Sequence, residues 1–266
     1  DATSARGTVN FGSPNSDRLL LTDSALAGES VRLTVVDVKT ISRDESTAIV
    51  EARLSLDGEA FSHTFTVDKG DNEYGVLHTW TLNEPLLASM TIATSGVGEV
   101  TVGEASVSVE GQDLYTAPIT LPAYPGIYPV VATGLGAYLE AEPMSVKAIL
   151  GHQSTATIVA EPTQALKDAV MQKVNERVAS CVAIPTSMED WCPYSLQSTT
   201  LSAMSVASPA VTFSRFGEGD FASDDAKLSY TQNATTWNPN PSPQSTRMSV
   251  RGTYRIDGDT VVVDFD

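Results

Sequence analysis

The sequence predicts a mainly β, multi-module fold, and three observations support this class. Apolar and polar residues alternate over most of the chain, as they do in half-buried strands. Turn-forming residues separate these alternating segments at short intervals. Only one stretch has the spacing of an amphipathic helix. With 266 residues, the chain is long enough for two or three modules, each with its own core.

Residues 1–112 predict a β-sandwich. The clearest alternation covers residues 48–56, and a second apolar face follows at residues 61–67. The phase of the alternation changes at Gly103, which predicts a β-bulge there. Strands at this spacing, with turns between them, are typical of a sandwich of two antiparallel sheets.

Residues 113–161 predict a small β module. Pro125-Gly126 is a turn signal between two short extended pieces, and further strands are expected at residues 146–148 and 155–159. A segment of about fifty residues can bury only a small core, so we expect this module to lean on a neighbour.

Residues 162–266 predict an α+β module that begins with the helix. Thr163 is a suitable N-cap, and apolar residues then recur at spacings of three and four as far as Cys181. The members of this stripe are Leu166, Ala169, Val170, Val174, Val178 and Cys181. An antiparallel sheet is expected to pack against them.

The strands of this sheet follow the helix. Residues 206–213 form one predicted strand, and residues 247–265 form a predicted hairpin around a two-residue turn, Asp257-Gly258. This turn would place Tyr254 opposite Val261. The polar, proline-containing segment 231–247 is expected to be an exposed loop.

Charge and cysteine use indicate an exported protein. The chain has 33 acidic and 16 basic residues and a net charge of −17, without a basic cluster, which argues against nucleic acid as a partner. Cys181 and Cys192 lack the further ligands of a zinc site, so we expect a disulfide, with two unlinked thiols as the alternative. The chain starts at Asp1 without the basic and apolar regions of a signal peptide, as expected for a mature exported chain or an ectodomain.

One combination of motifs carries a family resemblance. The helix ending at Cys181 precedes Trp191-Cys192-Pro193-Tyr194 and follows a Leu-Pro-x-x-Pro-Gly-x-Tyr segment that starts at Leu121. Over residues 114–266, the chain resembles the extracellular part of membrane-anchored surface proteins of actinobacteria, which often have Cys-Pro-Phe in place of Cys-Pro-Tyr. The resemblance implies an extracellular location and a module layout. It supplies no functional residues.

Some acidic residues and histidines have side chains that could bind a metal ion. Asp220, Asp224 and Asp225 lie in a glycine-containing stretch and are candidate Ca²⁺ ligands, with plain solvated turns as the alternative. His63 and His78 share the apolar parity of consecutive strands and could form a metal or acid–base pair, or pack separately. The sequence has no P-loop, dinucleotide-binding or Cys-x-x-Cys motif, so we expect no cofactor.

Four aromatic residues are candidates for carbohydrate or protein binding, with packing at module junctions as the alternative. They are Tyr124, Tyr128, Tyr138 and Trp237.

The expected function is that of a non-catalytic cell-envelope ectodomain for adhesion, scaffolding or recognition of a protein or wall polymer. Two alternatives remain open. One is a sensor that binds a small ligand between helix and sheet, beside Val170, Val174 and Val178. The other is a wall hydrolase that uses a pair of carboxylates.

Overall fold

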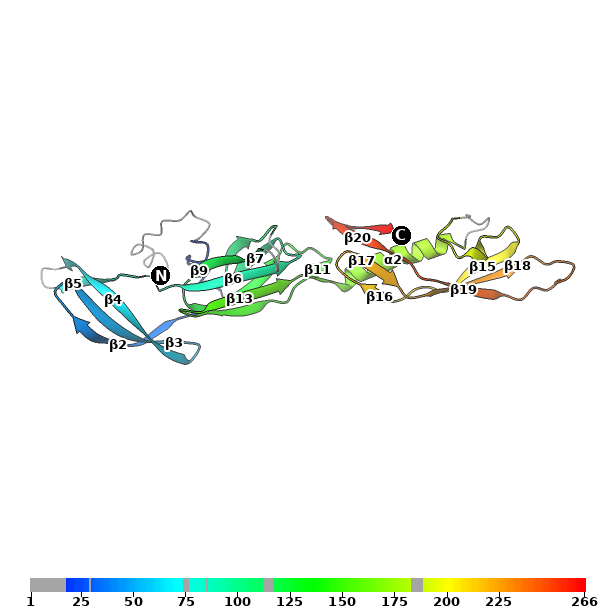
Figure 1. Cartoon of the computed structure of the whole chain (residues 1–266). Helices are drawn as coiled ribbons and strands as arrows, with labels where there is room; N and C mark the ends of the chain where they lie inside the picture. The colour runs from blue at the N-terminus through cyan, green and yellow to red at the C-terminus, as the bar shows by residue number, and fades with distance from the viewer. Residues whose placement is uncertain (1–17, 29, 74–76, 85, 112–116, 183–188) are drawn as a thin grey trace. The chain divides into compact units, whose positions relative to one another are not determined.

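The computed structural model describes residues 18–266, except 29, 74–76, 85, 112–116 and 183–188 (Figure 1). The described residues form a mainly β protein with one α-helix and several antiparallel sheets, as predicted. The chain divides into two compact units. Unit 1 contains residues 1–135 and 140–161, and unit 2 contains residues 136–139 and 162–266.

Two sheets share the main core of unit 1. One contains β1 (Val31–Arg32), β7 (Glu99–Val102), β8 (Ala105–Ser108), β10 (Gly126–Thr133) and β12 (Met144–Ala148). The other contains β6 (Ala88–Ser95), β9 (Ile119–Ala123) and β13 (Gln153–Val159), with β13 parallel to β6. Alternate residues of both sheets, including Met90, Ile92, Val100 and Tyr128, form one buried cluster. The two sheets fit a β-sandwich, but they combine strands from residues 1–112 with β9, β10, β12 and β13 from the following segment.

Most strands of the segment 113–161 belong to the two sheets of the main core of unit 1. Its strand β10 pairs with β1 and β7, and its strands β9 and β13 both pair with β6. A segment this short cannot bury its own apolar faces, and here it completes the sheets of the preceding strands. The strands predicted near residues 146–148 and 155–159 are present as β12 and β13.

Gly103 lies in a hairpin turn and not in the predicted β-bulge. Val102 pairs with Ala105, so Gly103 and Glu104 are the two loop residues between β7 and β8. Gly103 has a φ of 60°, which suits the first position of a type II′ turn. The phase of the alternation changes because the chain reverses direction at this point.

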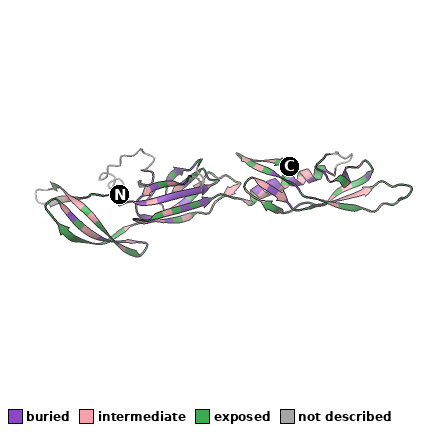
Figure 2. Ribbon diagram, viewed as in Figure 1, coloured by how far each residue is buried: buried purple, intermediate pink, exposed green. Residues whose placement is uncertain are grey.

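A third sheet in unit 1 has the strand order β2-β3-β4-β5. Its strands are β2 (Thr34–Arg43), β3 (Thr47–Leu56), β4 (Glu59–Glu73) and β5 (Leu77–Leu82). Ala48, Ala52, Leu54 and Leu56 are buried on one face of β3, as the alternation predicts, and lie outside the cluster of the sandwich core. By contrast, β2 is exposed along its whole length (Figure 2).

Unit 2 contains the helix α2 (Gln164–Ser180), which begins where the sequence predicts. The Thr163 side chain accepts a hydrogen bond from the backbone N–H of Leu166 and caps the helix. Leu166, Val170, Val174 and Val178 are fully buried. Each such side chain contributes about 2 kcal/mol to the stability of unit 2 through burial of apolar surface.

The rest of unit 2 forms two antiparallel sheets whose buried side chains join those of α2 in one cluster. The first sheet contains β15 (Leu201–Ser208), β18 (Ala226–Gln232) and β19 (Gln244–Met248). The second contains β16 (Phe213–Phe216), β17 (Asp220–Ser223), β20 (Arg251–Asp257) and β21 (Thr260–Phe265). Two short strands, β11 (Leu139–Glu140) and β14 (Glu161–Pro162), pair with each other.

Three predictions for these strands need correction. The segment 231–247, predicted to be an exposed loop, contains the end of β18 and most of β19, so only its middle part is a loop. The predicted strand 206–213 is interrupted at Pro209, so that β15 ends before it and β16 starts after it. The terminal hairpin exists, but Tyr254 pairs with Val263 and the loop residues are Gly258 and Asp259. An Asp257-Gly258 turn of type I′ would need a positive φ at both residues, whereas Gly258 at the first position needs only one.

Candidate functional site

The sheet of β15, β18 and β19, called here the neutral sheet, has an unusual composition for this acidic chain. Residues 193–214 and 228–246 contain no charged residue and no histidine. Lys227 and Arg247, which face each other at one end, are the exceptions in the three strands. Since the whole chain has a net charge of −17, this end of unit 2 differs in electrostatic character from the rest of the protein.

The exposed face of the neutral sheet carries small hydroxyl groups. Ser205 pairs with Ser229, and Ser229 pairs with Ser245, so three serines lie in one row across the strands. The opposite face carries Leu228 and Met248, which are buried in the core of unit 2. Because side chains alternate between the two faces of a strand, burial of the apolar face exposes the serine row.

The loop 233–243, called here the Trp237 tip, extends beyond the ends of β18 and β19 (Figure 1). Two hydrogen bonds close a turn within it: Thr235 N donates to Asn238 O (2.9 Å), and Asn238 N donates to Thr235 O (3.2 Å). The Thr235 hydroxyl accepts a further bond from Asn238 N at 3.0 Å. Trp237 is therefore held in a defined turn.

Prolines stiffen the returning arm of the Trp237 tip. Pro239, Pro241 and Pro243 alternate with Asn240 and Ser242. A proline fixes its own φ and also restricts the residue before it to extended conformations. The arm therefore loses little conformational entropy when it binds a partner.

Trp237 is the aromatic candidate that the structure leaves open to solvent. Its side chain is 96% exposed, whereas Tyr128 is fully buried and donates a hydrogen bond to Tyr124 O at 2.6 Å. Burial raises the pKa of the Tyr128 phenol. Tyr138 is half-buried and donates to Asp259 O at 3.3 Å. Tyr128 is thus packed within the core of unit 1 and Tyr138 is partly covered, so neither is an open binding residue.

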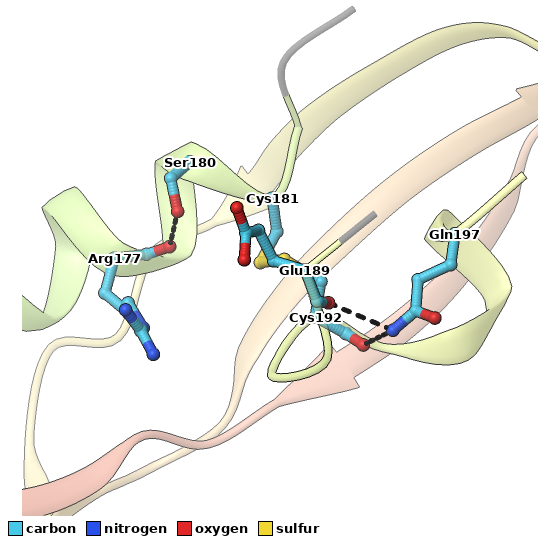
Figure 3. Close-up of a disulfide and its surroundings, with 6 residues drawn as sticks. All are labelled: Arg177, Ser180, Cys181, Glu189, Cys192 and Gln197. Carbon is cyan, nitrogen blue, oxygen red and sulfur yellow. Dashed lines mark hydrogen bonds between the residues drawn. A yellow bond between two sulfur atoms is a disulfide. The ribbon is translucent and has the colours of Figure 1, made fainter. Parts of the chain in front are cut away.

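The disulfide predicted between Cys181 and Cys192 is present, with a Cα–Cα distance of 5.6 Å (Figure 3). Cys181 is the C-cap of α2, so the disulfide joins the helix end to the loop that leads to β15. The Gln197 side-chain amide donates to Cys192 O (2.7 Å) and to Glu189 O (3.1 Å), which fixes that loop.

In the part of the chain that the structure describes, the helices lack the length and hydropathy needed to span a membrane.

The three candidate Ca²⁺ ligands have different partners. Asp220 forms an ion pair with Arg215 at 2.8 Å, Asp224 accepts a hydrogen bond from Thr212, and Asp225 lies 3.7 Å from Arg247. Within the described ranges, no three His, Cys, Asp or Glu side chains are grouped so that they could hold a metal ion.

The two strand histidines are separated by the strand register. His63 pairs with Ala52, whereas His78 pairs with Asn72, nine positions further along β4. Nine positions along a strand correspond to about 30 Å. Of the two alternatives, this register excludes a pair formed by the two histidines, because β5 pairs with the far end of β4. His63 instead contacts Phe65, with ring centroids 4.6 Å apart.

Two hollows bear on the alternative functions. In unit 1, Glu140, Glu142 and Glu161 line an open hollow of about 540 Å³. In unit 2, the first half of α2 and β16 line an open hollow of about 330 Å³ beside Met171, Phe213 and Phe216. Val170, Val174 and Val178, the predicted pocket residues, are packed in the core instead.

Among the residues that the structure describes, two carboxyl groups have lowered pKa values. Hydrogen bonds from the side chain and backbone of Thr47 lower the pKa of Asp44 to about 2. The pKa of Glu176 is lowered by a hydrogen bond from Lys173. A general acid needs the opposite shift, so neither group supports the hydrolase alternative.

Comparison with known proteins identifies no relative: no family model, curated protein or solved structure matches the chain. The candidate site is therefore argued from its own geometry. The neutral sheet was missed in the sequence, although two uncharged runs of this length in such an acidic chain are a visible signal.

Proposed function

We propose that the chain is an exported, non-catalytic ectodomain of the cell envelope that recognises a neutral wall polysaccharide through the Trp237 tip. The observation that carries this proposal is a 96% exposed tryptophan on a stiff, uncharged loop. An indole exposed to this extent leaves a large apolar surface in water, and tryptophan is the residue type most enriched at binding hot spots.

The chemistry around Trp237 favours a sugar polymer over a charged partner. The flat indole face can stack on the apolar face of a sugar ring. Amides and hydroxyls of the same loop, such as Asn238, Asn240 and Ser242, can donate to and accept from sugar hydroxyls. A charged ligand would find no counter-charge within residues 228–246.

An envelope location is part of the same proposal. The disulfide suits an oxidising compartment, and the resemblance to actinobacterial surface proteins supports the proposal of a location outside the cell. A neutral wall polymer is then a partner that the ectodomain would meet.

The experiment is cosedimentation of the protein with isolated cell walls. Wild type should pellet with the walls, and Trp237→Ala should lose at least about tenfold in affinity, equivalent to about 1.4 kcal/mol. The matched control is Tyr194→Ala, which removes another aromatic side chain that is 90% exposed and should bind as wild type does. Since both side chains are exposed, neither change should alter stability by more than about 0.5 kcal/mol.

Treatment of the walls distinguishes the class of partner. Periodate, which cleaves the vicinal diols of sugars, should abolish binding, while protease treatment should leave it unchanged. Loss of binding after protease alone would show that the partner is a protein and would contradict the polysaccharide proposal.

A second candidate function is small-ligand sensing, favoured by the 330 Å³ hollow beside Met171, Phe213 and Phe216. Lys167 and Asp168 at its edge could fix the orientation of a polar ligand. Screening by thermal shift would test this function. A ligand whose stabilisation disappears in Met171→Trp, which fills the hollow, would support it.

A further inference from the structure

The outer edge of the sheet β2-β3-β4-β5 is formed by β2. Within the described residues, β2 pairs with β3 alone, and all ten of its residues are exposed. Four of them are apolar, with exposed fractions of 64% for Val35, 56% for Val36 and Val38, and 55% for Ile41. A long apolar edge strand presents unpaired backbone N–H and C=O groups to any strand that can match them.

The sequence of β2 matches itself. An antiparallel pairing of two copies about a two-fold axis at Val38 places Asp37 of each copy opposite Lys39 of the other. The same pairing places Val38 of one copy opposite Val38 of the other, and the register shifts at Val36 and Ile41 flank these pairs. Opposite charges and apolar pairs at facing positions are the combinations that stabilise antiparallel strands.

The charges of β3 extend this match. Within the sheet, Asp37 already stands opposite Arg53, and Lys39 stands opposite Glu51. Self-pairing of β2 therefore creates a row across four strands in which the charge alternates: Arg53, Asp37, then Lys39 and Glu51 of the second copy. The two-fold axis produces this row twice.

Irregularities in β2 restrict the pairing to one register. The register of β2 with β3 shifts between Val35 and Asp37, and again between Thr40 and Ser42. The four residues from Asp37 to Thr40 are regular, and Val38 lies among them. Bulges on both sides of a short regular segment fix its register and prevent slippage.

We infer that the protein forms a two-fold symmetric dimer in which the β2 strands of two copies pair edge to edge around Val38. The partner is a second copy because the facing residues are complementary in this self-pairing. Such an interface is closed, so it produces a dimer and no larger assembly. This inference does not depend on the Trp237 tip, which lies in unit 2.

Val38 offers a test that separates pairing from folding. It stands opposite Ala52 in the sheet, so a charge at position 38 meets no charged neighbour across β3. Val38→Lys and Val38→Glu should each be monomeric, because two like charges would meet at the two-fold axis. An equimolar mixture of the two variants should form a dimer again, since the introduced lysine of one chain would face the introduced glutamate of the other. Val211→Lys, at a valine that is 74% exposed in unit 2, is the matched control and should stay dimeric.

Sedimentation of the full chain gives the readout, at concentrations up to about 1 mM. Wild type should have twice the monomer mass, and circular dichroism should show that all variants are folded. A monomeric wild type, a dimer that persists in either single variant, a mixture that stays monomeric or an assembly larger than a dimer would each overturn the inference.

Discussion

The two sheets of unit 2 share one core and differ on their exposed faces. The sheet of β16, β17, β20 and β21 carries ion pairs on its surface, Arg215 with Asp220 (2.8 Å) and Arg255 with Asp264 (2.9 Å). The neutral sheet carries a row of serines and the Trp237 tip. Exposed ion pairs contribute only about 0–1 kcal/mol each, so folding does not require charge on either face. The difference therefore concerns what each face meets in solution.

The two sheets are joined in a way that makes them one folding unit. β17 and β18 are nearly consecutive in the chain, and so are β19 and β20. At the short gaps between these strands, Ser223 N donates to Val250 O, and Val250 N donates to the Ser223 hydroxyl, both at 2.9 Å. Ser223 is buried, so this exchange satisfies polar groups that would otherwise be unpaired. The shared core and this junction predict that both sheets unfold together.

The largest effect is expected for Phe221→Ala, which tests whether the core is shared. Phe221 is fully buried and contacts the rings of Phe213 and Phe265, at centroid distances of 6.0 and 6.3 Å. The cavity left behind should lower the free energy of unfolding of unit 2 by about 3–5 kcal/mol. Urea denaturation followed by circular dichroism measures this loss.

Hydrogen exchange then localises the effect of Phe221→Ala. Backbone amides of β18 in the neutral sheet and of β20 in the other sheet should lose protection by the same amount, because opening of either sheet exposes the common core. Faster exchange in β20 alone would show that the two sheets are separate cooperative units and would contradict the comparison.

The second-largest effect on stability is expected when the disulfide is removed. The disulfide is connected more closely to the neutral sheet than to the sheet of β16, β17, β20 and β21. Cys192 precedes the 3₁₀-helix η2 (Tyr194–Leu196) and then β15, the edge strand of that sheet. Replacing both Cys181 and Cys192 with alanine removes a closure of eleven residue steps and should cost about 3 kcal/mol.

The double cysteine variant should loosen the two sheets unequally. Amides of β15 should lose more protection than amides of β20 and β21, since the freed loop no longer holds the entry to β15. Reduction of wild type with a thiol is the control and should reproduce the pattern. Equal loss in both sheets would mean that the disulfide acts on unit 2 as a whole.

Local sequence patterns predict individual helices and strands, but they do not show which strands pair with one another. The helix was predictable because Thr163 caps it and Leu166, Val170, Val174 and Val178 follow at helical spacing. The position of the segment 113–161 was not predictable, because alternation shows that a strand has an apolar face and does not show which strand it pairs with. The Asp-Gly dipeptides illustrate the same limit. Asp57-Gly58 forms the type I′ turn, with φ values of 53° and 79°, whereas Gly258-Asp259 forms the terminal turn.

The candidate site was predictable in part. Trp237 was identified because a tryptophan in a polar, proline-rich loop has no core to enter. Tyr128, chosen on similar grounds, is buried because β10 lies inside a sheet that the sequence did not reveal. The choice between a pair of His63 and His78 and their separate packing stayed open for the same reason, since β4 has fifteen residues and β5 pairs with its far end. Local chemistry can be read from sequence, and long-range register cannot.

The smallest effect on stability is expected for charged substitutions on the exposed faces of the two sheets of unit 2, which test binding. Ser245 is exposed on the neutral sheet, and Thr253 is exposed on β20 of the other sheet. Lysine or glutamate at either position should change the free energy of unfolding by less than about 0.5 kcal/mol. At Ser245, however, both charges should weaken binding to cell walls at least about fivefold, equivalent to about 1 kcal/mol. The reason is that a charge brought against a neutral polymer loses water without gaining a partner.

The same two substitutions at Thr253 should leave binding unchanged. If only one sign of charge at Ser245 weakened binding, the partner would itself be charged, and the neutral surface would have to be explained in another way.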